Sequence, residues 1–281
     1  MGYIYIFAEI VTENAGKLLE KYSYKTTDVH PRESLQYRFI SMTLFVGIFV
    51  FITQPGLPEL TLAVCIPMGL MVLISFIGNI LDEQSLKVND LSLREPLSNL
   101  KPLLAGFMGY LIFPEERNPL LLVALILGAL IVMWGIQYGK SSKQQKVGVM
   151  FLAGAIVFSA MLKNVYVLVL KNFSPEIISL VRLSSILFLL LLFFSPKKRV
   201  YGSKEKAKRY VFSAGFLYAA GSIASLYAIQ SLGLVVTMLF MLLGPALRYI
   251  TAYIFLGDEP DKNKIISSGM LGIIAVGVAF T

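Results

Sequence analysis

The chain has 281 residues, of which 56% are hydrophobic and only 15% are charged, and its mean hydropathy is +0.72. Soluble domains carry about 25% charged residues, so this composition excludes a water-soluble globular fold. The single cysteine, Cys65, and the single histidine, His30, exclude a disulfide framework and a zinc or histidine-based catalytic centre. The net charge is +8, and the Lys and Arg residues lie mainly in short loops between apolar segments. This placement is typical of membrane topology rather than of nucleic-acid binding.

Ten apolar segments of helical length follow one another, separated by short connections rich in proline and glycine. Most are close to the ~20 residues that cross a bilayer, so the predicted fold class is an all-α membrane protein with ten transmembrane helices. The predicted helices are residues 3–21, 35–53, 60–86, 91–113, 119–138, 147–170, 177–195, 210–230, 233–256 and 264–281.

The first predicted helix carries a polar stripe. Glu9, Glu13, Lys17 and Glu20 recur at helical spacing and therefore share one face. Each charge costs ~2.5–3.5 kcal/mol inside a bilayer unless it faces other helices or water. We therefore expect neighbouring helices to surround this stripe.

The sequence also indicates a duplication. Two residue pairs recur in the second half at an offset of 143 or 144 residues: Pro102 and Glu116 recur as Pro245 and Glu259, and Pro31 and Arg38 recur as Pro175 and Arg182. This offset predicts two units of five helices, at residues 1–140 and 145–281. Because five is odd, the second unit enters the membrane from the opposite side. The predicted architecture is therefore two inverted repeats, as in alternating-access transporters.

These motifs resemble the EamA domain of the drug/metabolite transporter superfamily, over nearly the whole chain. The second copy ends at Gly257-Asp258-Glu259, which fits the Gly-x-Glu turn of the family, whereas the first copy has Pro114 where glycine is usual. The resemblance implies a carrier of metabolites, amino acids, drugs, sugars or nucleotide sugars. It also implies that the first, third, fourth, sixth, eighth and ninth helices surround a central cavity, with the fifth and tenth at the periphery.

Polar residues within the spans gather on the helices that this resemblance places around the cavity. The candidate substrate-binding residues are Glu9, Glu13, Asn14, Lys17, Asn79, Asn99, Lys101, Lys163, Asn164, Tyr166, Tyr218, Tyr227 and Arg248. A cavity with charges of both signs suits a zwitterion or a small charged metabolite, because carboxylates bind its cation and Lys or Arg its anion.

Several of these residues also have purely structural interpretations. Glu13 and Lys17 are four apart in the favourable order for a helical ion pair, which could serve only to hold the first helix. The tyrosines could pack in the interior rather than form an aromatic cage for a quaternary ammonium. We expect Arg38 and Arg182 to be anchors at the membrane interface. For coupling to protons we prefer Glu13 to Glu9.

The predicted function is secondary active transport of a small polar, zwitterionic or charged metabolite by alternating access. The alternative is a proton-coupled exporter of drugs or quaternary cations. We expect no enzymatic activity, cofactor, metal or nucleic acid, and as partners membrane lipid, the solute and protons. The protein is expected to be a monomer or homodimer in the plasma or inner membrane. Basic residues concentrate in loops after odd-numbered helices, which places those loops in the cytoplasm and both termini outside.

Overall fold

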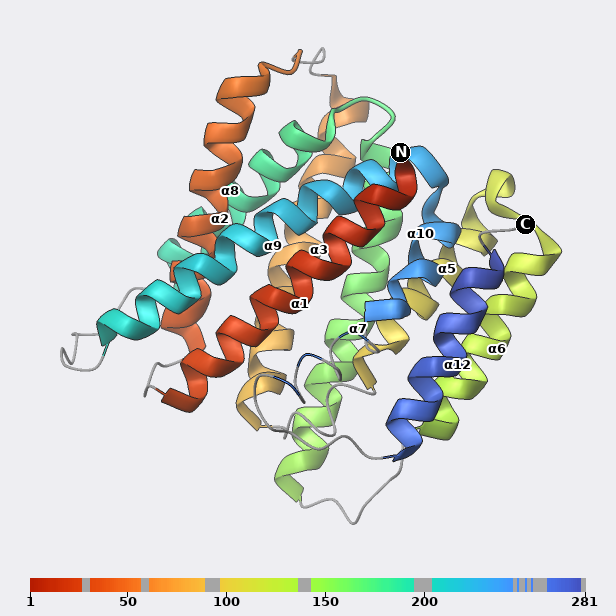
Figure 1. Cartoon of the computed structure of the whole chain (residues 1–281). Coiled ribbons are helices and arrows are strands. Elements are labelled where there is room, and N and C mark those ends of the chain that lie inside the picture. Colours follow the sequence, from red (N-terminus) through yellow and green to blue (C-terminus); the bar gives the residue numbers. More distant parts are fainter. Residues whose placement is uncertain are drawn as a thin grey trace.

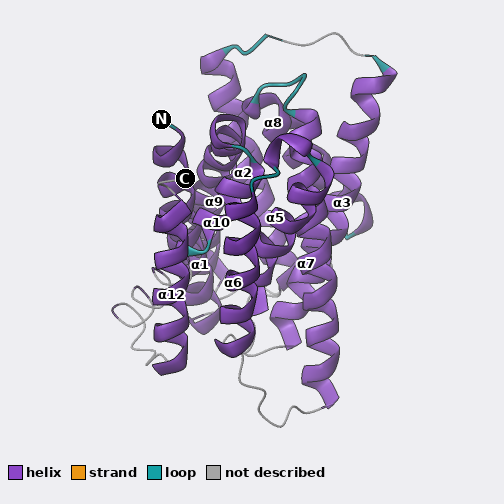
Figure 2. Cartoon of the chain, turned by 90° about the vertical axis from the view of Figure 1, so that its right-hand side faces the viewer, coloured by secondary structure: helices purple, strands orange, loops and turns teal. Residues whose placement is uncertain are grey.

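In the computed structural model the described residues form helices, turns and short connections (Figures 1 and 2). The structure describes residues 1–26, 31–56, 61–88, 97–135, 143–194, 204–244, 247, 251, 254 and 262–278. The α-helices are α1 (Gly2–Thr26), α2 (Pro31–Thr53), α3 (Leu62–Val88), α5 (Leu100–Ile112), α6 (Pro119–Gly135), α7 (Lys143–Val169), α8 (Pro175–Phe193), α9 (Lys204–Leu232), α10 (Leu234–Met241) and α12 (Lys262–Val278), and η1 (Pro114–Glu116) is a 3-10 turn.

The all-α fold class is thus confirmed, and each described α-helix matches one predicted segment. Among the described ranges, five helices are long and apolar enough to cross a membrane, namely α2, α3, α7, α8 and α9. The helices α5, α6 and α12 are apolar but shorter. The repeated residues Pro245 and Glu259 lie outside the described residues, so the second copy of that motif is not placed.

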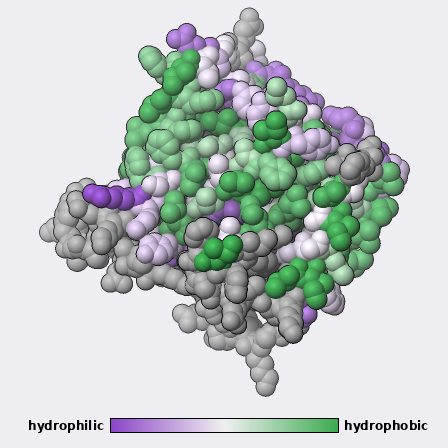
Figure 3. Space-filling view, viewed as in Figure 1, coloured by the Kyte–Doolittle hydropathy of each residue, from purple (hydrophilic) through white to green (hydrophobic). Residues whose placement is uncertain are grey.

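The outer surface is that of a protein surrounded by lipid. Large apolar side chains such as Phe51, Leu62 and Ile273 are more than 70% exposed. Figure 3 shows hydrophobic residues over most of one face, with hydrophilic residues mainly toward its edges. Exposed apolar area of this extent is unfavourable in water, so the protein is an integral membrane protein.

Helix α1 has its polar face inside and its apolar face outside. Ile4 and Phe7 are 69% and 62% exposed, whereas Glu9 and Glu20 are only 5% and 6% exposed. The helix runs alongside α9 (Figure 1), which covers part of its polar stripe. The expectation that neighbouring helices surround this stripe is therefore confirmed for Glu9 and Glu20, whereas Glu13 and Lys17 are about a third exposed.

The first residues of α8 show why the repeated proline marks a helix start. Pro175 occupies the first turn, where its missing N–H costs no hydrogen bond. Ser174 precedes it as N-cap and accepts a hydrogen bond from the Ile177 amide. Arg182 follows Pro175 by seven residues, or about two helical turns, so it lies well inside α8 rather than at its end. Pro31 and Arg38 have the same spacing in α2.

The turn η1 connects the first half of the chain to the start of α10. The Glu116 carboxylate accepts hydrogen bonds from the Leu234 and Val235 amides, at 2.6 and 3.2 Å. Gly233, just before α10, has a φ of 81°, and a Cβ there would lie 2.6 Å from a Glu116 oxygen. Only glycine fits both the backbone conformation and the close approach of the carboxylate.

We expect Glu116→Ala to lower the free energy of unfolding by about 0.5–2 kcal/mol, because two amides at the start of α10 lose their acceptor. Thermal unfolding of the purified protein in detergent measures this change. Glu115→Ala is the matched control, since Glu115 is the exposed neighbour in the same turn. Equal melting temperatures for the two variants would contradict the capping role.

Candidate functional site

A cavity of about 340 Å³ lies among the helices and is lined by residues from α1, α2, α3, α5, α7, α8, α9 and α10. Its volume is at the lower end of the range for small-molecule sites. The cavity is lined by most of the sequence candidates: Glu9, Glu13, Asn14, Lys17, Asn79, Asn99, Lys101, Lys163, Tyr166 and Tyr218.

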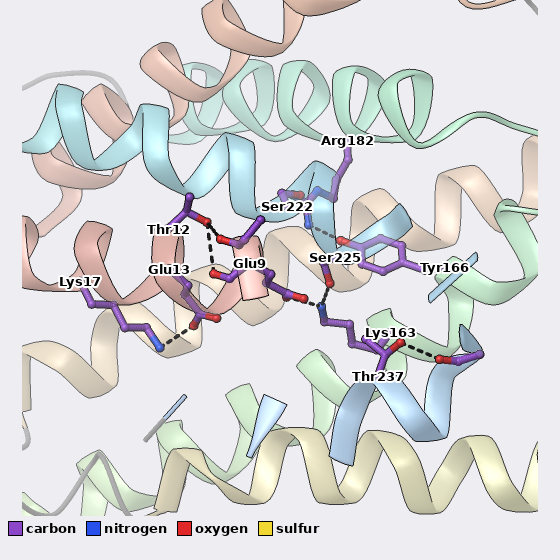
Figure 4. Close-up of polar contacts among 12 residues, drawn as sticks. Glu9, Thr12, Glu13, Lys17, Lys163, Tyr166, Arg182, Ser222, Ser225 and Thr237 are labelled. Atoms are coloured by element: carbon purple, nitrogen blue, oxygen red, sulfur yellow. Dashed lines mark hydrogen bonds and ion pairs between the residues drawn. The ribbon is translucent and has the colours of Figure 1, made fainter. Parts of the chain in front are cut away.

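The cavity is rich in charges that belong to different helices. Lys163 of α7 lies 3.3 Å from Glu9 of α1 and donates a hydrogen bond to Ser225 of α9 at 2.5 Å (Figure 4). The other carboxylate oxygen of Glu9, Oε2, is buried without a hydrogen-bond partner among the described residues. Side chains of three helices therefore meet at the Lys163 ammonium group, and Glu9 Oε2 accepts no hydrogen bond from the described residues.

Two ion pairs lie at the more exposed end of the cavity. Glu13 and Lys17 are 2.6 Å apart, as the helical spacing indicated, and both side chains are about a third exposed. Lys101 of α5 lies 2.6 Å from Asp82 of α3, a residue that the sequence analysis did not select. Because these side chains are more exposed than Glu9, the cavity is more accessible to solvent at this end.

The expectation that Arg38 is an interface anchor is wrong. Its guanidinium lies inside the bundle, 2.7 Å from Glu20 and 3.7 Å from Glu83, and all three side chains are nearly buried. Tyr218 donates a hydrogen bond to Glu20 at 2.9 Å, and its ring lies 5.4 Å from the Arg38 guanidinium carbon. Arg38 thus compensates two acidic groups that would otherwise be buried without a cation.

Arg182 was also expected at the interface and also lines the cavity. Its guanidinium donates hydrogen bonds to the hydroxyls of Tyr166 and Ser222, the latter at 2.7 Å. Its Nε is buried without a hydrogen-bond partner in the described ranges. The repeated spacing of proline and arginine could have revealed both residues, because seven residues place each arginine two turns inside its helix.

The remaining candidates lie elsewhere. Asn164 is buried and donates hydrogen bonds to the carbonyls of Ala105 and Ala160, which makes it a packing residue between α7 and α5. Tyr227 donates to Glu176 and stacks on Tyr5 with ring centres 5.0 Å apart, outside the cavity lining. Arg248 lies outside the described residues.

A polar cavity lined by charges of both signs among membrane helices is typical of carriers for small solutes. The model of the EamA-like transporter family matches residues 146–281. The second half of the chain therefore matches the EamA-like transporter family, and this match confirms the resemblance to the drug/metabolite transporter superfamily.

Comparison with solved structures supports the fold over the whole chain. One crystal structure, described only as that of a protein, aligns with a TM-score of 0.72 and covers 99% of this chain and 96% of its own, at 14% sequence identity. At that identity the likeness concerns the fold alone. No curated protein matches the sequence.

We expect Arg38→Met to lower the free energy of unfolding by about 3–5 kcal/mol, because Glu20 and Glu83 are then buried without their cation. The double variant Arg38→Met/Glu20→Gln should recover part of the loss, since one carboxylate is neutralised. Thermal unfolding in detergent compares the three proteins. An Arg38→Met variant as stable as the parent would contradict the interior role of this arginine.

Proposed function

We propose that the protein carries a small polar solute, zwitterionic or charged, across the plasma or inner membrane by alternating access. The observation that carries this proposal is the cavity among the helices, which is lined by charged residues of both signs. Side chains of this kind are costly in a membrane and are retained where they bind a solute or ions.

The packing of the helices supports a relation between two halves. Suppose that the helices of the first half, α1, α2, α3, α5 and α6, correspond in order to those of the second half, α7, α8, α9, α10 and α12. Exchanging the two halves then converts the contact between α1 and α9 into the contact between α7 and α3, and both contacts are present. The pairs α2–α8, α5–α10 and α6–α12 each join corresponding helices. A two-fold relation between residues 1–140 and 145–281 produces this pattern, as inverted repeats require.

The two ends of the cavity differ, which supports a state closed on one side. Toward the start of α1, Tyr5 stacks on Tyr227, and Tyr227 donates a hydrogen bond to the buried Glu176. Toward the end of α1, Lys17 and Lys101 are a quarter to a third exposed. We infer that the tyrosine pair closes one end and separates when the two halves rock.

The alternative of a quaternary-cation exporter has less support. The Tyr218 ring lies beneath the Arg38 guanidinium, and the Tyr166 ring lies within 6 Å of both Arg182 and Lys163, at 5.6 and 5.9 Å. Cations of the protein itself thus occupy the aromatic surfaces that a quaternary ammonium would need.

Protons remain our proposed coupling ion, but the structure favours a different carboxylate from the one preferred on sequence. Glu13 is paired with Lys17 at 2.6 Å, whereas Glu9 has a longer contact of 3.3 Å with Lys163 and one buried oxygen without a hydrogen-bond partner among the described residues. A proton can be added at Glu9 Oε2 without displacing a hydrogen bond of that oxygen. Glu9 is therefore the better candidate for the coupling residue.

We expect Glu9→Gln to abolish solute accumulation driven by a pH gradient and to leave exchange of solute for solute measurable. Uptake into proteoliposomes, with and without an imposed gradient, makes the comparison. In the same assay Glu13→Gln should still respond to the gradient. If Glu9→Gln also responds as the parent does, Glu9 is not the coupling residue.

A cross-link across the closed end tests alternating access directly. In a Cys65→Ser background, Tyr5→Cys and Tyr227→Cys are joined by a short, reducible bifunctional thiol reagent. We expect exchange in proteoliposomes to stop after cross-linking and to return after reduction. The two single-cysteine variants, treated in the same way, should remain active. Full exchange by the cross-linked protein would contradict the proposal that this end must open.

A further inference from the structure

Arg38 and Arg182 occupy corresponding positions of the sequence repeat, yet their electrostatic surroundings differ. Arg38 lies close to two carboxylates, Glu20 and Glu83. Arg182 has no carboxylate within ion-pair distance in the described part of the chain, and only two hydroxyls, of Tyr166 and Ser222, accept from it.

The sequence explains this difference. At the offset of 144 residues that relates Arg38 to Arg182, the counterpart of Glu20 is Asn164 and that of Glu83 is Tyr227. Both carboxylates that face Arg38 thus have uncharged counterparts in the second half. Around Arg182 the repeat has replaced the two negative charges by neutral polar groups.

Lys163 adds a second positive charge close to Arg182. Lys163 and Arg182 lie 5.9 and 5.6 Å from the centre of the same tyrosine ring, that of Tyr166. The nearby carboxylate, Glu9, already contacts Lys163 at 3.3 Å. The described groups around Tyr166 therefore carry one positive charge in excess.

The Arg182 side chain is only partly exposed, and its Nε is buried. A cation without a counter-charge is unfavourable in such a place, and an oxyanion that enters the cavity would remove this cost. A guanidinium presents its N–H groups in a planar fork that matches the two oxygens of a carboxylate or phosphate. The unpartnered Nε–H of Arg182 belongs to that fork.

A hydroxyl group completes the site. Ser222 accepts a hydrogen bond from Arg182, and its own hydroxyl proton can be donated to an anion. Ser225 lies three residues further along α9, on the same face, and accepts from Lys163 (Figure 4). Arg182, Ser222, Lys163 and Ser225 all line the cavity.

We propose that Arg182 is the anion-binding residue of the cavity, and that the carried solute bears a compact oxyanion, a carboxylate or a phosphate, bound by the Arg182 guanidinium and the Ser222 hydroxyl. The proposal rests on the proposed carrier function and specifies its substrate class. Arg38, already compensated by two carboxylates, has no such role.

Binding to the purified full-length protein in detergent tests the site independently of transport. The probes are glycolate, inorganic phosphate and the neutral glycolamide, at equal millimolar concentrations and constant ionic strength. We expect glycolate or phosphate, but not glycolamide, to raise the melting temperature of the parent, because a ligand of the native state stabilises it. Whichever anion does so identifies the group that the site recognises.

The Arg182→Gln variant should lose this stabilisation, with an affinity about tenfold to a hundredfold lower, which is the scale of a charge-assisted hydrogen bond. Its melting temperature without anion should equal or exceed that of the parent, because a partly buried cation without a counter-charge is gone. Arg117→Gln is the control, since Arg117 is a cation that donates to the carbonyl of Leu111 and does not line the cavity. It should respond as the parent does. Should Arg182→Gln fail to fold, Ser222→Ala must show the weakened response.

Three results overturn the anion site: no stabilisation of the parent by either anion, equal stabilisation by glycolamide, or an undiminished response in the folded variants. None of these results bears on solute exchange in proteoliposomes, so that assay tests the carrier proposal separately. Conversely, anion binding that depends on Arg182 in a protein that exchanges no solute would overturn the carrier proposal and retain the site.

Discussion

The cost of holding ionised groups away from water is the constraint on which this structure depends. Four charged residues lie on one face of α1, and each is acceptable in a membrane only beside a partner or an aqueous space. Glu20 is close to Arg38 of α2, and Glu9 is close to Lys163 of α7. The position of α1 against α9, with its apolar face outward, follows from this requirement. So does the presence of a polar cavity, because the partners converge there from several helices.

Different interactions stabilise the cavity lining and the packing of the helices. Apolar side chains of α5, α6, α10 and α12 form one cluster that includes Leu103, Leu125 and Leu271, and these contacts hold the helices through dispersion and shape. The ion pairs contribute specificity, since each must find its own partner. A carrier needs both properties. In the proposed alternating-access cycle the apolar contacts would slide, and the charged contacts would determine which arrangements are permitted.

The sequence predicted the fold well because helix length and hydropathy are local properties. The all-α class, the order of the helices, the buried polar face of α1 and the ion pair between Glu13 and Lys17 all depend on spacing within one segment. Pairing between helices is not local, and the sequence analysis could not supply it. Arg38 was assigned to the interface because its helix was predicted to begin at residue 35 rather than at Pro31, and its carboxylate partners, at residues 20 and 83, come from other helices. Asn164 was assigned to the cavity because its backbone acceptors, in α5 and in its own helix, cannot be recognised from residue types.

The separation in sequence between Glu9 and Lys163 has a consequence for the order of assembly. The other two ion pairs described for α1 require only α1 itself and the adjacent α2, so they can form early in synthesis. Lys163 follows the end of α1 by more than a hundred residues, and until then Glu9 costs ~2.5–3.5 kcal/mol inside a bilayer. We therefore expect α1 to reach its final position late in biogenesis, after α7 has entered the membrane.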